Sequence, residues 1–285
     1  MRMQQIFLHV PKTEAALKLG NQGINSMKMA DVEAWRGERM YWNLASEEDR
    51  QLHLSRYQFA RELFDPDWQC LDAACGSGYG ASYLADKVRS VDGVDVDRSA
   101  IDFARTTYKQ SNLTYQCADL QSTLPFANET FDAITSFETL EHVNDQAKMT
   151  SEFRRVLKPG GILVISTPDR EVSERIGLDN HFHVAELSKR EFVELLSRSF
   201  TVEQLFGHGE GQPVATAWRT MHQFLKLGTR LTGPKARSRV EHAFARPFGW
   251  LRSRFYKMSS SPIQLDTDID HAKSVHVIAV ARRRD

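Results

Sequence analysis

The sequence predicts an α/β fold, a doubly wound and mostly parallel sheet with helices on both faces. Short apolar runs alternate with segments of helical spacing between residues 47 and 206. A glycine-rich turn, Gly76–Gly80, follows the first core strand, and Asp72, Asp95 and Asp119 stand at or near the ends of three apolar runs. Apolar strands joined by helices are typical of a sheet buried on both faces. In such a sheet the ligand binds beyond the carboxyl ends of the strands.

The first unit of the predicted core is a strand, a tight turn and a helix. The run that ends at Asp72 leads into the glycine turn, and Ala81–Val88 predicts the helix. Glycine has no Cβ, so its backbone can approach a ligand closely, and a helix start offers unpaired N–H groups. The second strand, Val91–Asp95, ends in an acid placed as an acceptor for ribose hydroxyls would be. The glycines alone are a weak signal, because plain turns and many nucleotide sites share them.

Periodicity and turn signals predict the remaining elements. In chain order these are helix Glu47–Phe64, helix Ser99–Gln110, strand Leu113–Cys117, strand Phe131–Phe137, helix Gln146–Leu157, turn Lys158–Gly161, strand Ile162–Ser166, helix Ser188–Arg198, strand Phe200–Phe206 and strand Val275–Ala281. We therefore divide the chain into an N-terminal arm (1–46), a core (47–206), a basic and helical insertion (207–274), and a final core strand with a tail (275–285).

Composition limits the setting of the protein. A chain of 285 residues with 41% hydrophobic content can bury one large core, and 37 basic against 37 acidic residues favour no particular partner. Cys70, Cys75 and Cys117 are an odd count without CxxC spacing, which predicts reduced thiols. The chain start lacks a signal-peptide apolar region, and no window approaches 18 apolar residues. We therefore expect a cytoplasmic location, with peripheral contact at the inner face of the membrane as an option considered below.

The segments Asp72–Gly78, Gly93–Asp95 and Ala118–Leu120 together resemble the cofactor motifs of class I S-adenosylmethionine-dependent methyltransferases. Further landmarks of that family are matched by Leu124–Phe126, Phe131–Asp132 and Arg155–Gly161. More narrowly, the chain resembles bacterial methyltransferases associated with surface-glycan biosynthesis at Gly37–Arg39, His53–Tyr57, Ser136–Val143 and Asn180–Val184. In that group a proline usually stands at the position of His181. The resemblance implies a Rossmann-like, seven-stranded sheet whose last strand is antiparallel.

The resemblance also implies S-adenosylmethionine as the cofactor and a set of residues that bind it. The glycine turn would admit the methionine end, Asp95 would accept from the ribose hydroxyls, and Asp119 from the adenine amino group. The slot for the adenine would be formed by Val96, Leu120 and Phe137. The complete set of predicted cofactor residues is Asp72, Ala74, Gly76, Gly78, Asp95, Val96, Asp119, Leu120 and Phe137.

Catalytic candidates follow the strand 131–137. A hydroxyl acceptor must lose a proton, and a neutral histidine such as His142 can take it. In the sugar O-methyltransferases that the chain resembles, a histidine here is the proposed base and an acid after the next strand its orienter, a role that Asp169 fits. His183 is a third catalytic candidate. His181 and His183 suggest a metal with His142, but no carboxylate spacing fixes a ligand set, so no metal is predicted. The structural alternative is that His142 caps a helix and Asp169 starts a turn.

The insertion is strongly basic. Residues 212–258 carry ten lysines and arginines against a single acid, Glu241, with large apolar residues interleaved. Basic amphipathic helices of this kind predict contact with an anionic membrane surface. A helical lid over the core, with solvated charges, is the structural alternative, and a homodimer contact is also open. Nucleic acid is not expected, because no recognisable binding motif accompanies the charge.

These observations predict an S-adenosylmethionine-dependent methyltransferase that methylates a sugar hydroxyl during cell-surface polysaccharide or glycolipid biosynthesis. One alternative acceptor is a small aromatic or quinone-like metabolite, methylated on oxygen or nitrogen. A second alternative is a cofactor-binding scaffold without catalysis. A dinucleotide-dependent oxidoreductase shares the spacing Gly76-x-Gly78-x-x-Ala81, but Asp72, Asp119 and the final strand argue against it.

Overall fold

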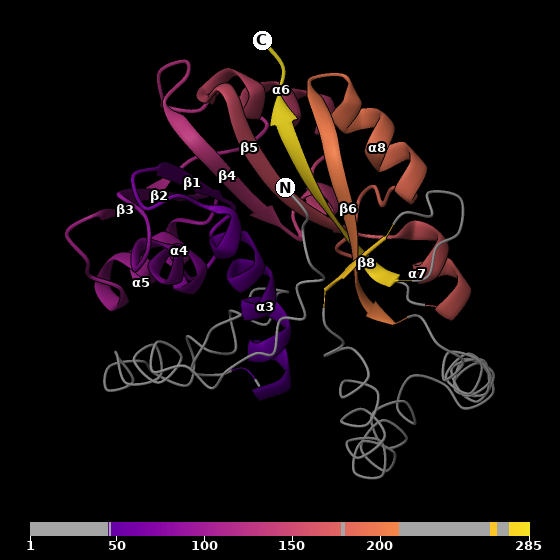
Figure 1. The fold of residues 1–285 in the computed structure, drawn as a ribbon. Helices are drawn as coiled ribbons and strands as arrows, with labels where there is room; N and C mark the ends of the chain where they lie inside the picture. Colours follow the sequence, from indigo (N-terminus) through magenta and orange to yellow (C-terminus); the bar gives the residue numbers. More distant parts are fainter. Residues whose placement is uncertain (1–44, 46, 178–179, 211–262, 267–273) are drawn as a thin grey trace, which may run out of the picture.

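The computed structural model describes residue 45 and residues 47–177, 180–210, 263–266 and 274–285 (Figure 1). Nearly all of the predicted N-terminal arm and most of the predicted basic insertion, including every basic residue counted above, lie outside these ranges. The strand β6 continues to Glu210, so the described core takes up the first residues that the sequence assigned to the insertion.

A single eight-stranded sheet forms the centre of the described fold. Its strand order is β3-β2-β1-β4-β5-β8-β6-β7. The first five strands in this order, from β3 to β5, all pair in parallel with their neighbours. The strand β8 lies between β5 and β6 and is antiparallel to both. The strand bounds are β1 Gln69–Ala73, β2 Ser90–Asp95, β3 Leu113–Cys117, β4 Phe131–Phe137, β5 Leu157–Pro168, β6 Phe200–Glu210, β7 Gln264–Leu265 and β8 Ser274–Arg283. The predicted mostly parallel sheet with an antiparallel last strand is confirmed, with the two-residue β7 added at its edge.

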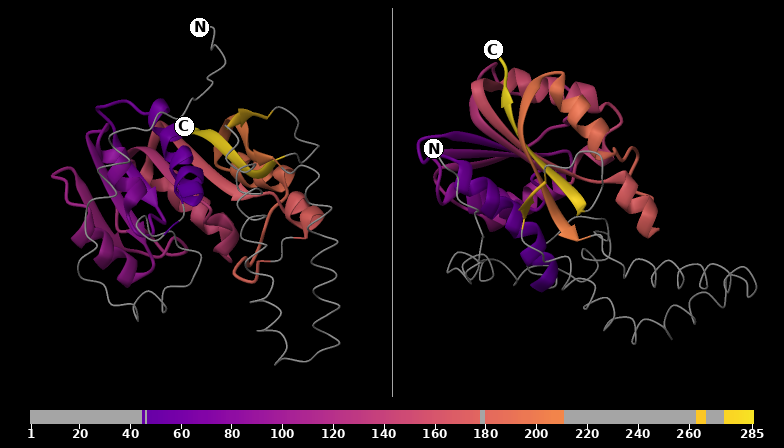
Figure 2. Two further views of the ribbon diagram at one scale, coloured as in Figure 1. Left: turned by 90° about the horizontal axis from the view of Figure 1, so that it is seen from below. Right: turned by 45° about the vertical axis from the view of Figure 1, so that its right-hand side comes forward.

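Helices cover both faces of the sheet (Figure 2). The helix bounds are α3 Glu47–Leu63, α4 Tyr79–Ala85, α5 Arg98–Thr107, the 3₁₀ helix η1 Leu140–His142, α6 Gln146–Val156, α7 Arg170–Ile176 and α8 Lys189–Ser197. One apolar core joins α3, α4 and α5 to the sheet, and the second joins α6 and α8 to the opposite face. Alternate residues of β1 serve the two cores, because Cys70 belongs to the first and Leu71 to the second.

Local sequence signals explain where several helices begin. The Asp97 side chain accepts a hydrogen bond from the Ser99 N–H and caps α5. Ser188 and Glu191 form a reciprocal capping box at the start of α8. The helix α7 was not predicted. It begins directly after Asp169, whose side chain accepts from the Glu171 N–H.

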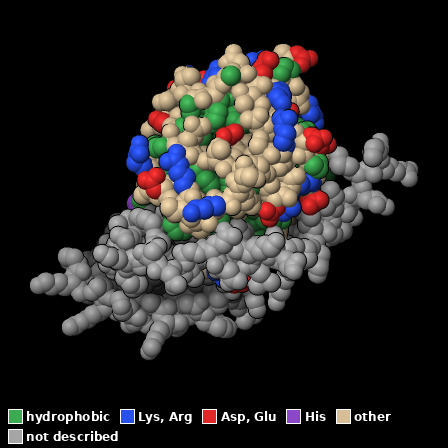
Figure 3. All heavy atoms as spheres, turned by 90° about the vertical axis from the view of Figure 1, so that its left-hand side faces the viewer, with side chains coloured by type: hydrophobic (Ala, Val, Ile, Leu, Met, Phe, Trp, Pro, Cys, Tyr) green, Lys and Arg blue, Asp and Glu red, His purple; other side chains and the backbone are tan. Residues whose placement is uncertain are grey.

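Two further sequence expectations concern the cysteines and the membrane. All three cysteines are free, with Cys70 and Cys75 buried and Cys117 exposed. Within the described ranges, every helix is too short or too polar to cross a bilayer. On the face shown in Figure 3, lysines and arginines lie among aspartates and glutamates, so that face presents no field of a single charge.

Candidate active site

A cavity of about 510 Å³ lies beyond the carboxyl ends of β1, β2 and β4, on the side where the sheet topology predicts a ligand. Its lining comes from six parts of the chain. These are α3 (His53, Arg56, Tyr57), the turn after β1 (Ala74–Ser77 and Tyr79), the end of β2 (Asp95, Val96), the loop after β3 (Ala118–Gln121), the end of β4 with the segment that follows it (Phe137–Thr139, His142, Val143), and a later loop (Phe182). Seven of the nine predicted cofactor residues are in this lining.

Two glycines in the turn after β1, Gly76 and Gly78, have different structural roles. Both have a positive φ, +53° at Gly76 and +89° at Gly78. A Cβ on Gly76 would meet nothing within 4 Å, so the backbone there is open on the cavity side. A Cβ on Gly78 would lie 2.6 Å from the Ala104 Cβ and 2.8 Å from the Tyr115 Oη. Gly78 is therefore a packing glycine that brings the turn close to α5 and β3, and it is outside the cavity lining.

The two acids at neighbouring strand ends lie in different surroundings. Asp95 is buried, and its carboxylate accepts from the Gly76 N–H and the Asp97 N–H, each at 2.9 Å. Asp95 thus fixes the glycine turn to the end of β2. Asp119 is exposed and accepts from the Gln121 N–H. Between them, Val96 and Leu120 offer an apolar strip.

Asp72 lies behind the cavity and is not part of its lining. Its carboxylate accepts from the Thr135 hydroxyl at 2.8 Å and from the Tyr57 hydroxyl at 3.2 Å. Complete burial raises the pKa of Asp72 to about 7, although both hydroxyls stabilise the charged form. Because the Tyr57 ring does line the cavity, Asp72 acts on the site by holding this ring in place.

Arg56 is a cavity residue that the sequence analysis did not select. It is 1% exposed, and its Nη2 lies 3.6 Å from the Glu138 Oε1. The Nε and Nη1 atoms of this guanidinium are buried without a hydrogen-bond partner in the described structure. Buried N–H donors without acceptors are costly, so this arginine offers two donors to an anionic ligand group. Its position within a helical segment gave no signal from the sequence.

Glu138 anchors a polar cluster beside Arg56. The residue has φ +51°, a strained value for a side chain with a Cβ. Its carboxylate accepts from the Ser166 hydroxyl at 2.6 Å and pairs with His276 Nε2 at 3.0 Å. Burial favours the neutral acid, but Arg56 and His276 outweigh it and hold the pKa of Glu138 well below its ordinary value. Glu138 is therefore a carboxylate with its charge already balanced.

Two histidines, the buried His208 and the half-buried His53, complete this cluster in neutral form. Burial and the charge of Arg56 lower the pKa of His53 to about 4 and that of His208 to about 2. At neutral pH neither ring adds positive charge to the site, and Arg56 remains the strong cation of this wall.

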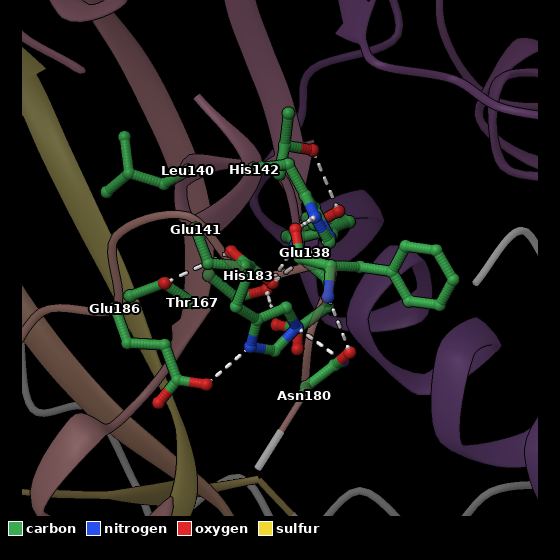
Figure 4. A network of polar contacts seen from close by, with 12 residues as sticks. Glu138, Leu140, Glu141, His142, Thr167, Asn180, His183 and Glu186 are labelled. Carbon is green, nitrogen blue, oxygen red and sulfur yellow. Dashed lines mark hydrogen bonds and ion pairs between the residues drawn. The ribbon is translucent and has the colours of Figure 1, made fainter. Parts of the chain in front are cut away.

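The predicted catalytic histidines lie together, as Figure 4 shows, and His142 is in the cavity lining whereas His183 is not. The ring centres of His142 and His183 are 5.0 Å apart. His142 Nδ1 is 3.1 Å from the Phe182 carbonyl oxygen, and His183 Nδ1 contacts the Glu186 carboxylate. Glu141, which the sequence analysis did not select, lies beneath them with 1% exposure and accepts from the Thr167 hydroxyl at 3.1 Å.

Asp169 is outside the cavity lining. Its Oδ1 caps α7, and its N–H donates to the Val275 carbonyl oxygen at 2.9 Å. Burial raises the pKa of this carboxyl. The geometry is that of a residue that begins a helix, whereas the structural alternative in the sequence analysis was that Asp169 starts a turn.

The strand order, the glycine turn and the acids at successive strand ends define a class I methyltransferase fold. Solved structures agree on this fold. A SAM-dependent methyltransferase from Thermotoga maritima aligns with a TM-score of 0.55 and 16% identity over 90% of this chain and 96% of its own. A protein from Pyrococcus horikoshii aligns with a TM-score of 0.55 and 24% identity over 65% of this chain and 95% of its own.

Sequence comparison then identifies the domain. Residues 71–165 match the family model described as "Methyltransferase domain". A probable S-adenosylmethionine-dependent methyltransferase of Mycolicibacterium smegmatis is 39% identical over 147 residues, which are 50% of this chain and 56% of that protein. A ubiquinone biosynthesis O-methyltransferase of Coxiella burnetii is 40% identical over 102 residues, 35% of this chain and 43% of that protein. The chain thus spans about half the length of the curated relatives it matches.

Residues 71–165 are thus similar to a methyltransferase domain, and the names of the relatives imply S-adenosylmethionine as the cofactor. The cavity fits this molecule chemically. The open backbone at Gly76 and the unpartnered donors of Arg56 suit a methionine carboxylate, and Asp95 is a buried acceptor at the end of β2. The apolar strip at Val96 and Leu120 suits a planar ring.

Proposed function

We propose that the protein methylates a hydroxyl oxygen of a sugar acceptor during assembly of a cell-surface polysaccharide or glycolipid. One observation carries the choice of a hydroxyl acceptor. The cavity lining holds an apolar strip at Val96 and Leu120, which suits an adenine, together with the imidazole of His142. An alcohol needs such a group to receive its proton, whereas an amine is already nucleophilic when neutral.

The chain's own residues would orient the reactants and move the proton. Bound S-adenosylmethionine supplies a methyl group already activated by its sulfonium. The cavity walls place the acceptor oxygen in line with that methyl group, which supplies much of the rate enhancement. As the new C–O bond forms and the C–S bond breaks, the hydroxyl proton passes to His142, which is one-third exposed at the cavity. His183 would act beside it, whereas Asp169 would position α7 and not the base.

The assignment of a sugar follows from the resemblance to glycan-associated methyltransferases and from the polar wall formed by His53, Arg56, Glu138 and Thr139. A small aromatic or quinone-like acceptor is the second candidate. The identity shared with the ubiquinone biosynthesis O-methyltransferase and the exposed Phe182 at the cavity both favour it. For the basic segment 212–258, which lies outside the described residues, we propose peripheral contact with an anionic membrane.

The test is turnover with S-adenosylmethionine and two acceptor panels, hydroxylated sugars and catechol-type phenols. We expect methylated sugars, and His142→Ala should lower turnover by roughly 10²–10⁴-fold while cofactor affinity stays nearly unchanged. The control is His181→Ala, because His181 is exposed and outside the cavity lining. Methylation of phenols alone would select the second candidate. Cofactor binding with no turnover on either panel would favour a binding scaffold.

A further inference from the structure

Three potential ligand atoms converge where the loop before α8 meets the segment after β4. Glu141, His142 and His183 each offer one atom, and these atoms all lie within 4.8 Å of one another. Figure 4 shows the two imidazoles close to the Glu141 carboxylate, which comes from the 3₁₀ helix η1. The sequence suggested His142 and His183 but no carboxylate. The fold supplies it from the residue directly before His142.

Hydrogen bonds at the far side of each ring fix its tautomer. The Phe182 carbonyl oxygen only accepts, so His142 Nδ1 carries the proton and donates to it. The Glu186 carboxylate likewise accepts from His183 Nδ1. Both rings therefore keep the lone pair on Nε2. An imidazole whose second nitrogen donates to a carbonyl or carboxylate is the usual arrangement of a metal ligand.

The Glu141 carboxylate is likewise held by a hydrogen bond on one side, with its other side toward the imidazoles. One oxygen of Glu141 accepts from Thr167, which leaves the other oxygen 4.0 Å from His142 Nε2. The neighbouring Glu138 is already engaged, because its carboxylate pairs with Arg56 and His276. The ion site therefore includes Glu141 and not Glu138.

We infer that Glu141, His142 and His183 bind a divalent transition-metal ion at the end of the cavity. Two imidazoles and a carboxylate suit Zn²⁺ and its first-row neighbours, whereas Mg²⁺ and Ca²⁺ prefer oxygen ligands. Bonds of about 2.0–2.1 Å require the three ligand atoms to draw together around the ion. The Asn180 amide, now 2.9 Å from His183 Nε2, gives up that contact when the ion binds.

This inference refines the proposed function and rests on it for the role of the ion. Three protein ligands leave a coordination position that faces the cavity, since His142 is in the cavity lining. An acceptor hydroxyl bound there has a lowered pKa and loses its proton to water. The alkoxide then takes the methyl group, so the ion replaces proton removal by the His142 ring.

Calorimetry with Zn²⁺ on chelator-treated protein tests the site directly. We expect one saturable site in the wild type, loss of that site in His183→Ala and Glu141→Gln, and a 10–100-fold weaker site in Glu186→Gln. His181→Ala is the matched control and should bind as the wild type does, because its ring is exposed beside the cluster without belonging to it. Co²⁺ absorption in the same samples would report nitrogen ligands.

Cofactor binding in each sample separates the possible failures. A variant that still binds S-adenosylmethionine is folded, so its loss of Zn²⁺ binding is specific. Equal Zn²⁺ binding by wild type and His183→Ala, or full methyl transfer after chelation, would overturn the metal site and leave the proposed function standing with His142 as the base. Zn²⁺ binding without any methyl transfer would instead overturn the proposed function.

Discussion

At the residue scale, Arg56 is the main cavity residue that the sequence analysis did not predict. Its charge is buried against the cavity with two donors unpartnered in the described structure. In the sequence it is one polar residue within a helical segment, and neither spacing nor composition tells which face of that helix meets the sheet. Ala74, Gly76 and Asp95 were predictable because backbone conformation and strand ends restrict the residue types there. The long-range contacts that place Arg56 are not encoded locally.

Arg56→Met should weaken the binding of S-adenosylmethionine. Hydrogen bonds to charged groups contribute about 1.5–3 kcal/mol, which corresponds to roughly 10- to 150-fold in affinity. Methionine keeps the apolar stem and removes the donors. The matched control is Arg61→Met on the same helix, where the guanidinium lies over the Tyr83 ring and not in the cavity lining. Calorimetric titration measures both, and an unchanged dissociation constant for Arg56→Met would exclude Arg56 from the cofactor site.

Asp72 predicts a pH dependence of stability. Its pKa rises from 3.8 to about 7 on folding, so the native state holds the proton more tightly than the unfolded state does. The stabilising contribution is complete below pH 3.8 and is lost as the pH rises through 7. Asp72→Asn cannot titrate, so its Tm should fall less than that of the wild type between pH 4 and pH 7. Thermal unfolding followed by circular dichroism measures this, and parallel Tm profiles would contradict the assigned pKa.

At the element scale, the sequence predicted the strands better than the short connections. The bounds of β3 and β4 agree with the prediction, because each is an apolar run between turn signals. The helix α7 was missed, since seven residues show little helical period and, unlike the equally short α4, it does not follow a glycine turn after a strand. Likewise, the predicted turn Lys158–Gly161 lies within the strand β5, with only Gly160 at a positive φ of +71°.

The strand β8 should be intolerant of proline. Ala279 is completely buried and pairs with Ile165 of β5 and Leu205 of β6. Ala279→Pro removes a ladder N–H and leaves a partner unpaired, at about 1–3 kcal/mol before any steric clash. For a domain of this size that is roughly 2–12 °C in Tm. Arg284→Pro, just beyond the strand, is the control that should melt within a degree or two of wild type. Equal melting of both variants would show that β8 is dispensable.

At the scale of the whole molecule, the sequence predicted the sheet, the helices on both of its faces and the edge at which the cavity lies. The alternating strand and helix periodicities predict this layered arrangement, because they reflect burial on both faces of the sheet along the whole core. Glu141 shows what such reasoning cannot supply. It adjoins His142 in the chain, but its relation to His183 depends on how a later loop returns to the end of β4.

The central place of β8 also has a consequence for biosynthesis. The edges of β5 and β6 that face each other are joined only by β8, a strand translated after both of them. Until Ser274–Arg283 leaves the ribosome, each of these strands presents unpaired backbone groups toward the gap. The nascent chain therefore passes through a stage in which the facing edges of β5 and β6 are open to other chains. Assembly of this domain depends on keeping those edges apart until translation has supplied the strand that joins them.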